Sequence, residues 1–305
     1  MDRVRLMCWC RSCVSGLHLP AFAAADAGLF AEQGLDVEFV SCVAPSAGSL
    51  QGWSEMVTAV AAGEADFALT SVAYLLAGQA AAQGRLAARF AAVFHQRNPI
   101  AALVASDSGL REPEDLPGRK LAARGSWYVE ELEGAVAELG LAPLTRVAPR
   151  QEIIAALGSG EVDVIPGWMD MTPSYSKGGR EVRAIALQLD GYATGLVAAD
   201  RLALQLVSRM RNALAAGYEL QRDQPEVGIA AFRRRFPGVS EQHLRTGWAA
   251  FEPYAFAGPA PLSMDAGRWQ RTIEYTVATH GLPSVPAEQV YRPELLASAI
   301  ECMPA

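Results

Sequence analysis

The first forty residues constrain the fold more than any other part of the chain. Apolar residues at 4–9 predict a strand, Pro20 opens an alanine-rich helix that Gly34 ends, and residues 36–41 predict a second strand. In a strand–loop–helix–strand unit, the loop after the first strand faces the crevice where ligands bind. Three cysteines and a histidine lie in or beside this loop, so chemistry is expected there: Cys8, Cys10, Cys13 and His18.

The same region carries a family resemblance. Residues 18–22, His-Leu-Pro-Ala-Phe, continued by residues 28–37, resemble the start of the solute-binding family that includes thiamine-precursor, sulfonate, nitrate and taurine binders. The resemblance implies an α/β fold of type II periplasmic-binding-protein architecture, with two lobes, mixed sheets and an interlobe cleft. Further segments similar to this family lie between about residue 3 and about residue 255: 61–67, 96–99, 107–110, 115–120, 160–163 and 167–173.

An internal echo supports two similar α/β lobes. Residues 57–67 and 153–164 each read as a helix that ends at a glycine, followed by an aspartate that begins a buried strand. Chance similarity between two such junctions is the alternative, because glycine ends many helices.

The order of elements predicts that one lobe is inserted into the other. Residues 1–96 and 192–305 are assigned to lobe one, and residues 97–191 to lobe two. Two strand crossings, near 95–99 and 190–195, would allow hinge closure over a ligand. Four helices are expected after the second crossing, at about 202–222, 225–235, 240–249 and 264–279.

Composition narrows the function class. The chain has 305 residues, is 51% hydrophobic and carries a net charge of −7, which suits a large core and argues against a nucleic-acid partner. No apolar run approaches the roughly 20 residues of a membrane helix, so no membrane insertion is expected. No signal peptide is evident. We therefore expect a cytoplasmic protein as the chain stands, or an extracytoplasmic or periplasmic one if a signal was removed.

Two serines lie where an anion could bind. Gly125 and Ser126 precede a helix-like segment that begins Trp127-Tyr128, and a capping serine before free helix N–H groups favours an anion. The resemblance implies a ligand contact at this turn. Ser71, after the strand expected at 67–70, occupies the corresponding place in lobe one. Ordinary helix capping is the alternative at both positions.

Aromatic side chains are expected to line the crevice. A single tryptophan at such a place more often belongs to a core, but several converging rings would indicate a site for a planar ligand. Asp170 stands where the family usually has asparagine, and its acceptor-only carboxylate would favour an amine or heterocyclic N–H over a simple anion. The expected ring residues are Trp9, Trp127, Tyr128, Trp168 and Tyr192, and the expected polar contacts include His18 and Asn98.

The main hypothesis is reversible binding of a small polar, anionic or heteroaromatic molecule in the interlobe cleft. The resemblance implies this role in substrate-binding proteins of ABC importers, so an ABC permease is the expected partner. No cofactor is expected.

A cytoplasmic enzyme on the same fold is the alternative. Cys10 or Cys13, activated by Arg11 or His18, would attack a small aromatic or acidic substrate in lyase- or hydrolase-like chemistry. Either cysteine resembles in position the loop cysteine of a sulfinate desulfinase, whose histidine and arginine partners have no match in residues 42–55. A metal site is not expected, because zinc usually takes four ligands and the motif offers too few. His95 and His243 show no partner in the sequence pattern and are assigned structural or exposed roles.

Overall fold

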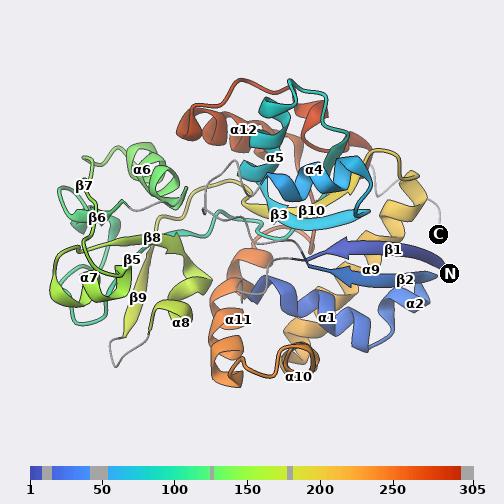
Figure 1. The fold of residues 1–305 in the computed structure, drawn as a ribbon, viewed down its shortest axis with the longest axis horizontal. Helices are drawn as coiled ribbons and strands as arrows, with labels where there is room; N and C mark the ends of the chain where they lie inside the picture. Colours follow the sequence, from blue (N-terminus) through green and yellow to red (C-terminus); the bar gives the residue numbers. More distant parts are fainter. Residues whose placement is uncertain (9–15, 42–53, 124–126, 177–180, 297–305) are drawn as a thin grey trace.

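Five strands form the larger sheet, in the order β2-β1-β3-β10-β4 (Figure 1). Strands β1, β2 and β3 run parallel, and β10 pairs antiparallel with both β3 and β4. The strands are β1 (Asp2–Met7), β2 (Leu35–Val40), β3 (Phe67–Ser71), β4 (Ala88–Val93) and β10 (Thr194–Ala199). We call the part of the molecule built on this sheet lobe one. The computed structural model describes residues 1–8, 16–41, 54–123, 127–176 and 181–296.

Helices cover lobe one from both ends of the chain. The early helices are α1 (Leu19–Asp26), α2 (Leu29–Glu32), α4 (Glu55–Ala62) and α5 (Val72–Ala81), with the 3-10 turn η1 (Gly16–His18) before α1. The late helices are α9 (Leu204–Asp223), α10 (Pro225–Arg235), α11 (Glu241–Ala255) and α12 (Ala266–His280), followed by η4 (Ala287–Gln289) and η5 (Pro293–Leu295). Figure 1 shows α1 and α10 below the sheet and α4, α5 and α12 above it, and α9 packs against α1.

Lobe two is built on two smaller sheets. Strand β5 lies between β8 and β9 and is antiparallel to both, while β6 and β7 form a parallel pair. A bridge between Leu121 and Val164 joins the two sheets. The strands are β5 (Ile100–Ala105), β6 (Lys120–Ala122), β7 (Thr145–Val147), β8 (Ile165–Trp168) and β9 (Val182–Ala186). The helices are α6 (Tyr128–Glu138), α7 (Ile153–Ser159) and α8 (Thr172–Tyr175), with η2 (Pro113–Asp115) and η3 (Met169–Met171).

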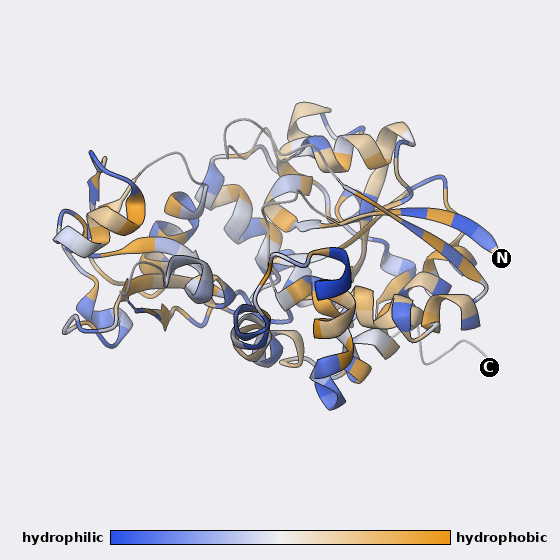
Figure 2. Cartoon of the chain, turned by 60° about the horizontal axis from the view of Figure 1, so that its bottom comes forward, coloured by the Kyte–Doolittle hydropathy of each residue, from blue (hydrophilic) through white to orange (hydrophobic). Residues whose placement is uncertain are grey.

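Burial follows the position of each strand. Strands β5 and β10 are buried along their whole length, as expected for central strands covered on both faces. At the edge of the larger sheet, β1 and β2 alternate between apolar and polar residues near the N-terminus (Figure 2).

The chain passes between the lobes twice, between β4 and β5 and between β9 and β10. The boundaries at 96/97 and 191/192 stay a proposal.

One expected helix is two helices. The alanine-rich segment was expected to be helical from Pro20 to Gly34, but α1 ends at Asp26 and α2 begins at Leu29. Gly28 lies between them with φ 77°, a left-handed conformation that glycine adopts without the steric penalty of a side chain. The late helix expected at 240–249 runs on to Ala255, through an internal proline at 253.

The internal echo of the sequence is also a structural repeat. In lobe one, the Asp66 carboxylate accepts from the backbone N–H of Arg5 at 2.7 Å, and the Arg5 side chain donates to the carbonyl of Gly63 at 2.6 Å. In lobe two, the Asp163 carboxylate accepts from the N–H of Lys120 at 2.9 Å, and the Lys120 amine donates to the carbonyl of Gly160, the residue after α7, at 2.6 Å. Both lobes therefore join a helix to a strand by the same junction, in which a glycine ends the helix and an aspartate binds the neighbouring strand. We call this junction the corner.

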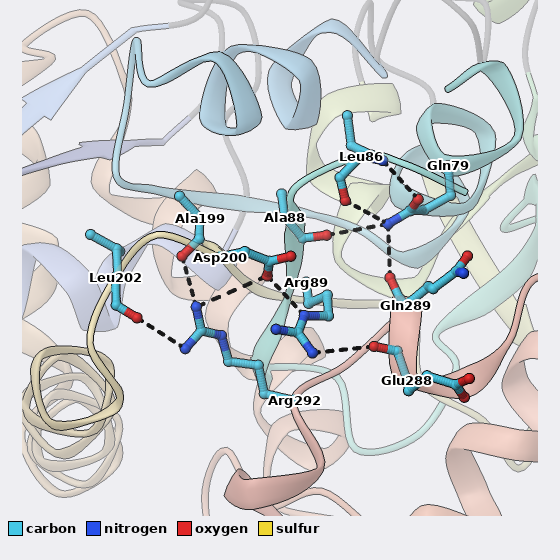
Figure 3. Close-up of polar contacts among 10 residues, drawn as sticks. All are labelled: Gln79, Leu86, Ala88, Arg89, Ala199, Asp200, Leu202, Glu288, Gln289 and Arg292. Atoms are coloured by element: carbon cyan, nitrogen blue, oxygen red, sulfur yellow. Dashed lines mark hydrogen bonds and ion pairs between the residues drawn. The ribbon is translucent and has the colours of Figure 1, made fainter. Parts of the chain in front are cut away.

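A polar network fixes the late chain against lobe one (Figure 3). The buried Gln79 amide donates to the carbonyl of Gln289 at 2.8 Å and to that of Leu86 at 3.0 Å. Arg292 donates to the carbonyls of Ala199 and Leu202 at 2.7 and 3.2 Å. These bonds hold the last described segment beside β4.

Candidate functional site

Aromatic rings from both lobes meet at one place. Trp127 lies against Tyr74, Tyr128 and Trp168, with centroid distances of 5.2, 4.3 and 5.8 Å. Tyr74 is in the first turn of α5 in lobe one, whereas Trp127 and Tyr128 begin α6 and Trp168 ends β8 in lobe two. With His95, described next, these residues form what we call the interlobe aromatic cluster. Three of its rings were expected at the crevice, and the structure brings them together.

His95 completes the cluster from the first crossing. The imidazole is fully buried, between the rings of Trp168 at 5.3 Å and Phe251 at 4.7 Å. Its Nδ1 lies 2.7 Å from the hydroxyl of Thr194, the first residue of β10. Burial lowers the pKa of the His95 imidazole to about 3, so the ring is neutral at physiological pH.

Asp170 carries a buried carboxylate near Tyr128 of the cluster. It lies in η3 immediately after β8 and is 2% exposed. Burial, together with nearby Tyr74 and Asp170, raises the pKa of the Tyr128 hydroxyl well above its ordinary value. Helix α11 packs against both η3 and η1, and η1 ends at the buried His18. The two elements that carry Asp170 and His18 thus pack against the same helix.

Ser71 acts as a helix cap. Its hydroxyl accepts from the N–H of Ala73 at 3.3 Å and caps α5, the ordinary role considered above. Ser71 also pairs with Thr194 in the sheet, so it lies at the same strand ends as the partner of His95. A ligand contact at Ser71 stays a prediction.

Asn98 and Tyr192 lie at a different place. Both line a cavity of about 660 Å³ bounded by α6, α12 and the second crossing. The N–H of Tyr192 donates to Thr272 at 3.0 Å, and its hydroxyl accepts from the N–H of Asp265 at 2.8 Å. Among the described residues, the ring of Tyr192 contacts Trp269 and no ring of the cluster. The Asn98 side chain accepts from the N–H of Ile100 at 2.9 Å.

Five predicted site residues lie outside the part of the chain that the structure describes: Trp9, Cys10, Cys13, Gly125 and Ser126.

Within the described ranges, no group of three or more His, Cys, Asp or Glu side chains could hold a metal ion. No helix among the described residues is both long enough and apolar enough to span a bilayer.

Tyr74 and His95 were not predicted as site residues from the sequence. Tyr74 comes shortly after β3 and Ser71, and His95 comes shortly after β4, where the first crossing begins. The rule that ligands bind at carboxyl ends of strands could have drawn attention to both. Neither residue belongs to a recognisable sequence motif, and a single histidine or tyrosine does not indicate a site unless its neighbours in space are known.

Comparison with known proteins places the chain in a family. Residues 16–227, more than half of the chain, match the model of the family described as NMT1/THI5 like. No curated protein matches the chain by sequence.

Three solved structures illustrate the likeness of fold. The alkanesulfonate-binding protein SsuA from Xanthomonas axonopodis pv. citri, bound to MOPS, is 19% identical with a TM-score of 0.64, over 95% of this chain and 98% of that one. The aliphatic sulphonate binding protein SsuA from Escherichia coli is 18% identical with a TM-score of 0.69, over 96% and 93%. A mutant of DSZB in complex with biphenyl-2-sulfinic acid is 16% identical with a TM-score of 0.62, over 98% and 99%. The chain therefore belongs to the NMT1/THI5-like family and has the two-lobed type II periplasmic-binding-protein fold.

Proposed function

We propose that the protein reversibly binds a small polar, anionic or heteroaromatic molecule between its lobes, as the substrate-binding component of an ABC importer. The observation that carries the proposal is the interlobe aromatic cluster. Aromatic faces hold planar molecules by stacking, and they supply contact area with few rotatable bonds. Rings contributed by both lobes would enclose a molecule when the lobes close.

Family membership and the sulfonate-binding neighbours support the same proposal. The two SsuA proteins share the fold over nearly their whole length, and one of them is bound to a sulfonate buffer. An importer would supply the permease as the partner of the closed, loaded form.

Titration calorimetry with purified protein tests this function. The panel is MOPS, taurine, biphenyl-2-sulfinate and 4-amino-5-hydroxymethyl-2-methylpyrimidine. We expect one compound to bind with a stoichiometry of one and to stabilise the fold, by about 2.7 kcal/mol when present at 100 times its Kd. The absence of both heat and stabilisation for every compound would contradict the proposal.

The same experiment distinguishes binding from the cysteine-dependent alternative. A binding protein releases its ligand unchanged, so mass spectrometry of the recovered compound should show the original mass. A new product, lost when Cys10 and Cys13 are both changed to serine, would replace the binding proposal with the enzymatic one.

A further inference from the structure

We propose that His95 and Trp168 are the hydrogen-bonding specificity determinants of this ligand site, and that they select an aromatic or other planar ligand carrying an oxygen acceptor. The inference rests on the proposed function. It names the residues that would recognise the polar end of the ligand, and it assigns a binding role to a histidine that the sequence pattern left as structural.

Both side chains carry a buried polar atom without a partner. Among the described residues, neither Nε2 of His95 nor Nε1 of Trp168 has a hydrogen-bond partner. The two rings contact each other, with centroids 5.3 Å apart, and Trp168 is 7% exposed. A buried polar group without a partner destabilises the fold, so two of them on contacting rings at the lobe interface need an explanation.

The contact with Thr194 favours one tautomer of His95. Thr194 is 3% exposed, and its hydroxyl has no other hydrogen-bond partner among the described residues. If Nδ1 carried the proton, the hydroxyl hydrogen would be buried without an acceptor. If the hydroxyl donates to Nδ1 instead, both groups are satisfied and the proton lies on Nε2. His95 then presents an N–H donor, as Trp168 does.

Two neutral donors on adjacent rings define the ligand class. They match an oxygen acceptor such as a carbonyl, carboxylate, sulfinate or sulfonate, and they recognise it by hydrogen bonds rather than by a positive charge. The rings of Trp127 and Tyr128 both contact Trp168 and would hold the planar part of the ligand. A ligand that lacks the acceptor would leave both donors unpaired and would bind more weakly.

Matched variants test the inference. Trp168→Phe keeps an aromatic ring and removes the N–H. Trp269→Phe is the control, because Trp269 also has a buried Nε1 without a partner in the described residues, but it lies in the core of lobe one. His95→Asn keeps an amide for Thr194 and removes the group at the position of Nε2. Circular dichroism confirms folding, and calorimetry with the four-compound panel gives the affinities.

We expect Trp168→Phe and His95→Asn each to raise the Kd of the bound compound by about tenfold to a hundredfold. Trp269→Phe should leave the Kd unchanged, and the indole N–H resonance of Trp168 should move downfield in ¹H–¹⁵N spectra when the compound binds. If His95→Asn does not fold, Trp168→Phe and the resonance decide.

Wild-type affinity in the folded variants, with an unmoved resonance, would overturn the inference and leave the proposed function intact. If no compound binds the wild-type protein, the proposed function and this inference fail together.

Discussion

His95 connects the two crossings between the lobes. It follows β4, at the start of the first crossing, and its hydrogen-bond partner Thr194 begins β10 at the end of the second. The imidazole also separates a ring of lobe two, Trp168, from a ring of lobe one, Phe251. A single side chain therefore contacts both hinge segments and both lobes, so its state bears on stability as well as on binding.

We expect His95 to make the fold sensitive to acid. Its pKa is about 3 in the folded protein, against about 6.5 in an unfolded chain, so between these values the unfolded state binds more protons. The contribution of His95 to stability should be constant well above pH 6.5 and should fall by about 1.4 kcal/mol per pH unit between pH 6.5 and about pH 3. Urea unfolding of the wild-type protein and of His95→Asn at pH 7 and pH 5 measures this effect. Equal losses of stability in the two proteins would show that His95 is not the sensitive group.

Among the rings of the interlobe aromatic cluster, Trp127 should contribute most to ligand binding. Its indole meets Tyr74 across the lobes and stacks on Tyr128, and it is 5% exposed. Trp127→Ala should weaken ligand binding by about 1–3 kcal/mol, the range for loss of an aromatic anchor in a desolvated pocket. Calorimetry with the bound panel compound measures it. Phe256→Ala, which removes a ring that packs against Arg222 and Tyr218 and contacts no ring of the cluster among the described residues, is the control and should keep wild-type affinity.

At the scale of elements, the repeated corner explains why the two lobes resemble each other. A positive φ at Gly63 and Gly160 lets each helix end and turn, and the aspartate that follows binds the N–H of the neighbouring strand. The same local sequence thus specifies a helix end, a turn and a strand pairing in both lobes. The corner lies away from the cluster and serves the scaffold.

Loss of either corner aspartate should destabilise the fold. Asp66→Ala and Asp163→Ala each leave a backbone N–H without its acceptor, which costs about 1–3 kcal/mol. Because the two corners share no partner, the double variant should lose the sum of the two effects. Chemical unfolding of both single variants and the double variant measures them. Asp223→Ala, at the exposed end of α9, is the control, and a loss of stability as large as at the corners would contradict the argument.

At the scale of the whole molecule, the lobes already touch on two sides of the crossings. Helix α11 packs against η3 and α8, and α12 packs against α6, where the Tyr275 hydroxyl donates to the carbonyl of Glu131 at 2.8 Å. A ligand between the lobes would add contacts to the closed arrangement and would shift the population toward it.

Small-angle scattering should detect this closure. The radius of gyration is expected to decrease when the panel compound that binds is added at saturation, because rotation about two crossings brings the lobes together with little repacking. Trp168→Phe at the same compound concentration should show less compaction. A radius that does not change at proven saturation would show that the protein binds without hinge motion.

The sequence by itself determined those features that depend on neighbouring residues. Helix α10 has the predicted bounds, Pro225–Arg235, because a proline at the start of a helix is a local signal. The family pattern identified the fold, and the internal echo identified two matching corners. The break at Gly28 was missed because a glycine inside a helical pattern does not by itself show whether the chain turns there.

Only the tertiary structure decided which residues form the site. His95 and Trp168 are separated by more than seventy residues, as Tyr74 and Trp127 are by more than fifty, so no local pattern relates them. Tyr192 was predicted to line the crevice together with Trp168, yet its ring packs on Trp269. Whether a ring or an imidazole belongs to a core or to a binding site depends on what surrounds it in space, and that is fixed by how two lobes, one inserted into the other, meet.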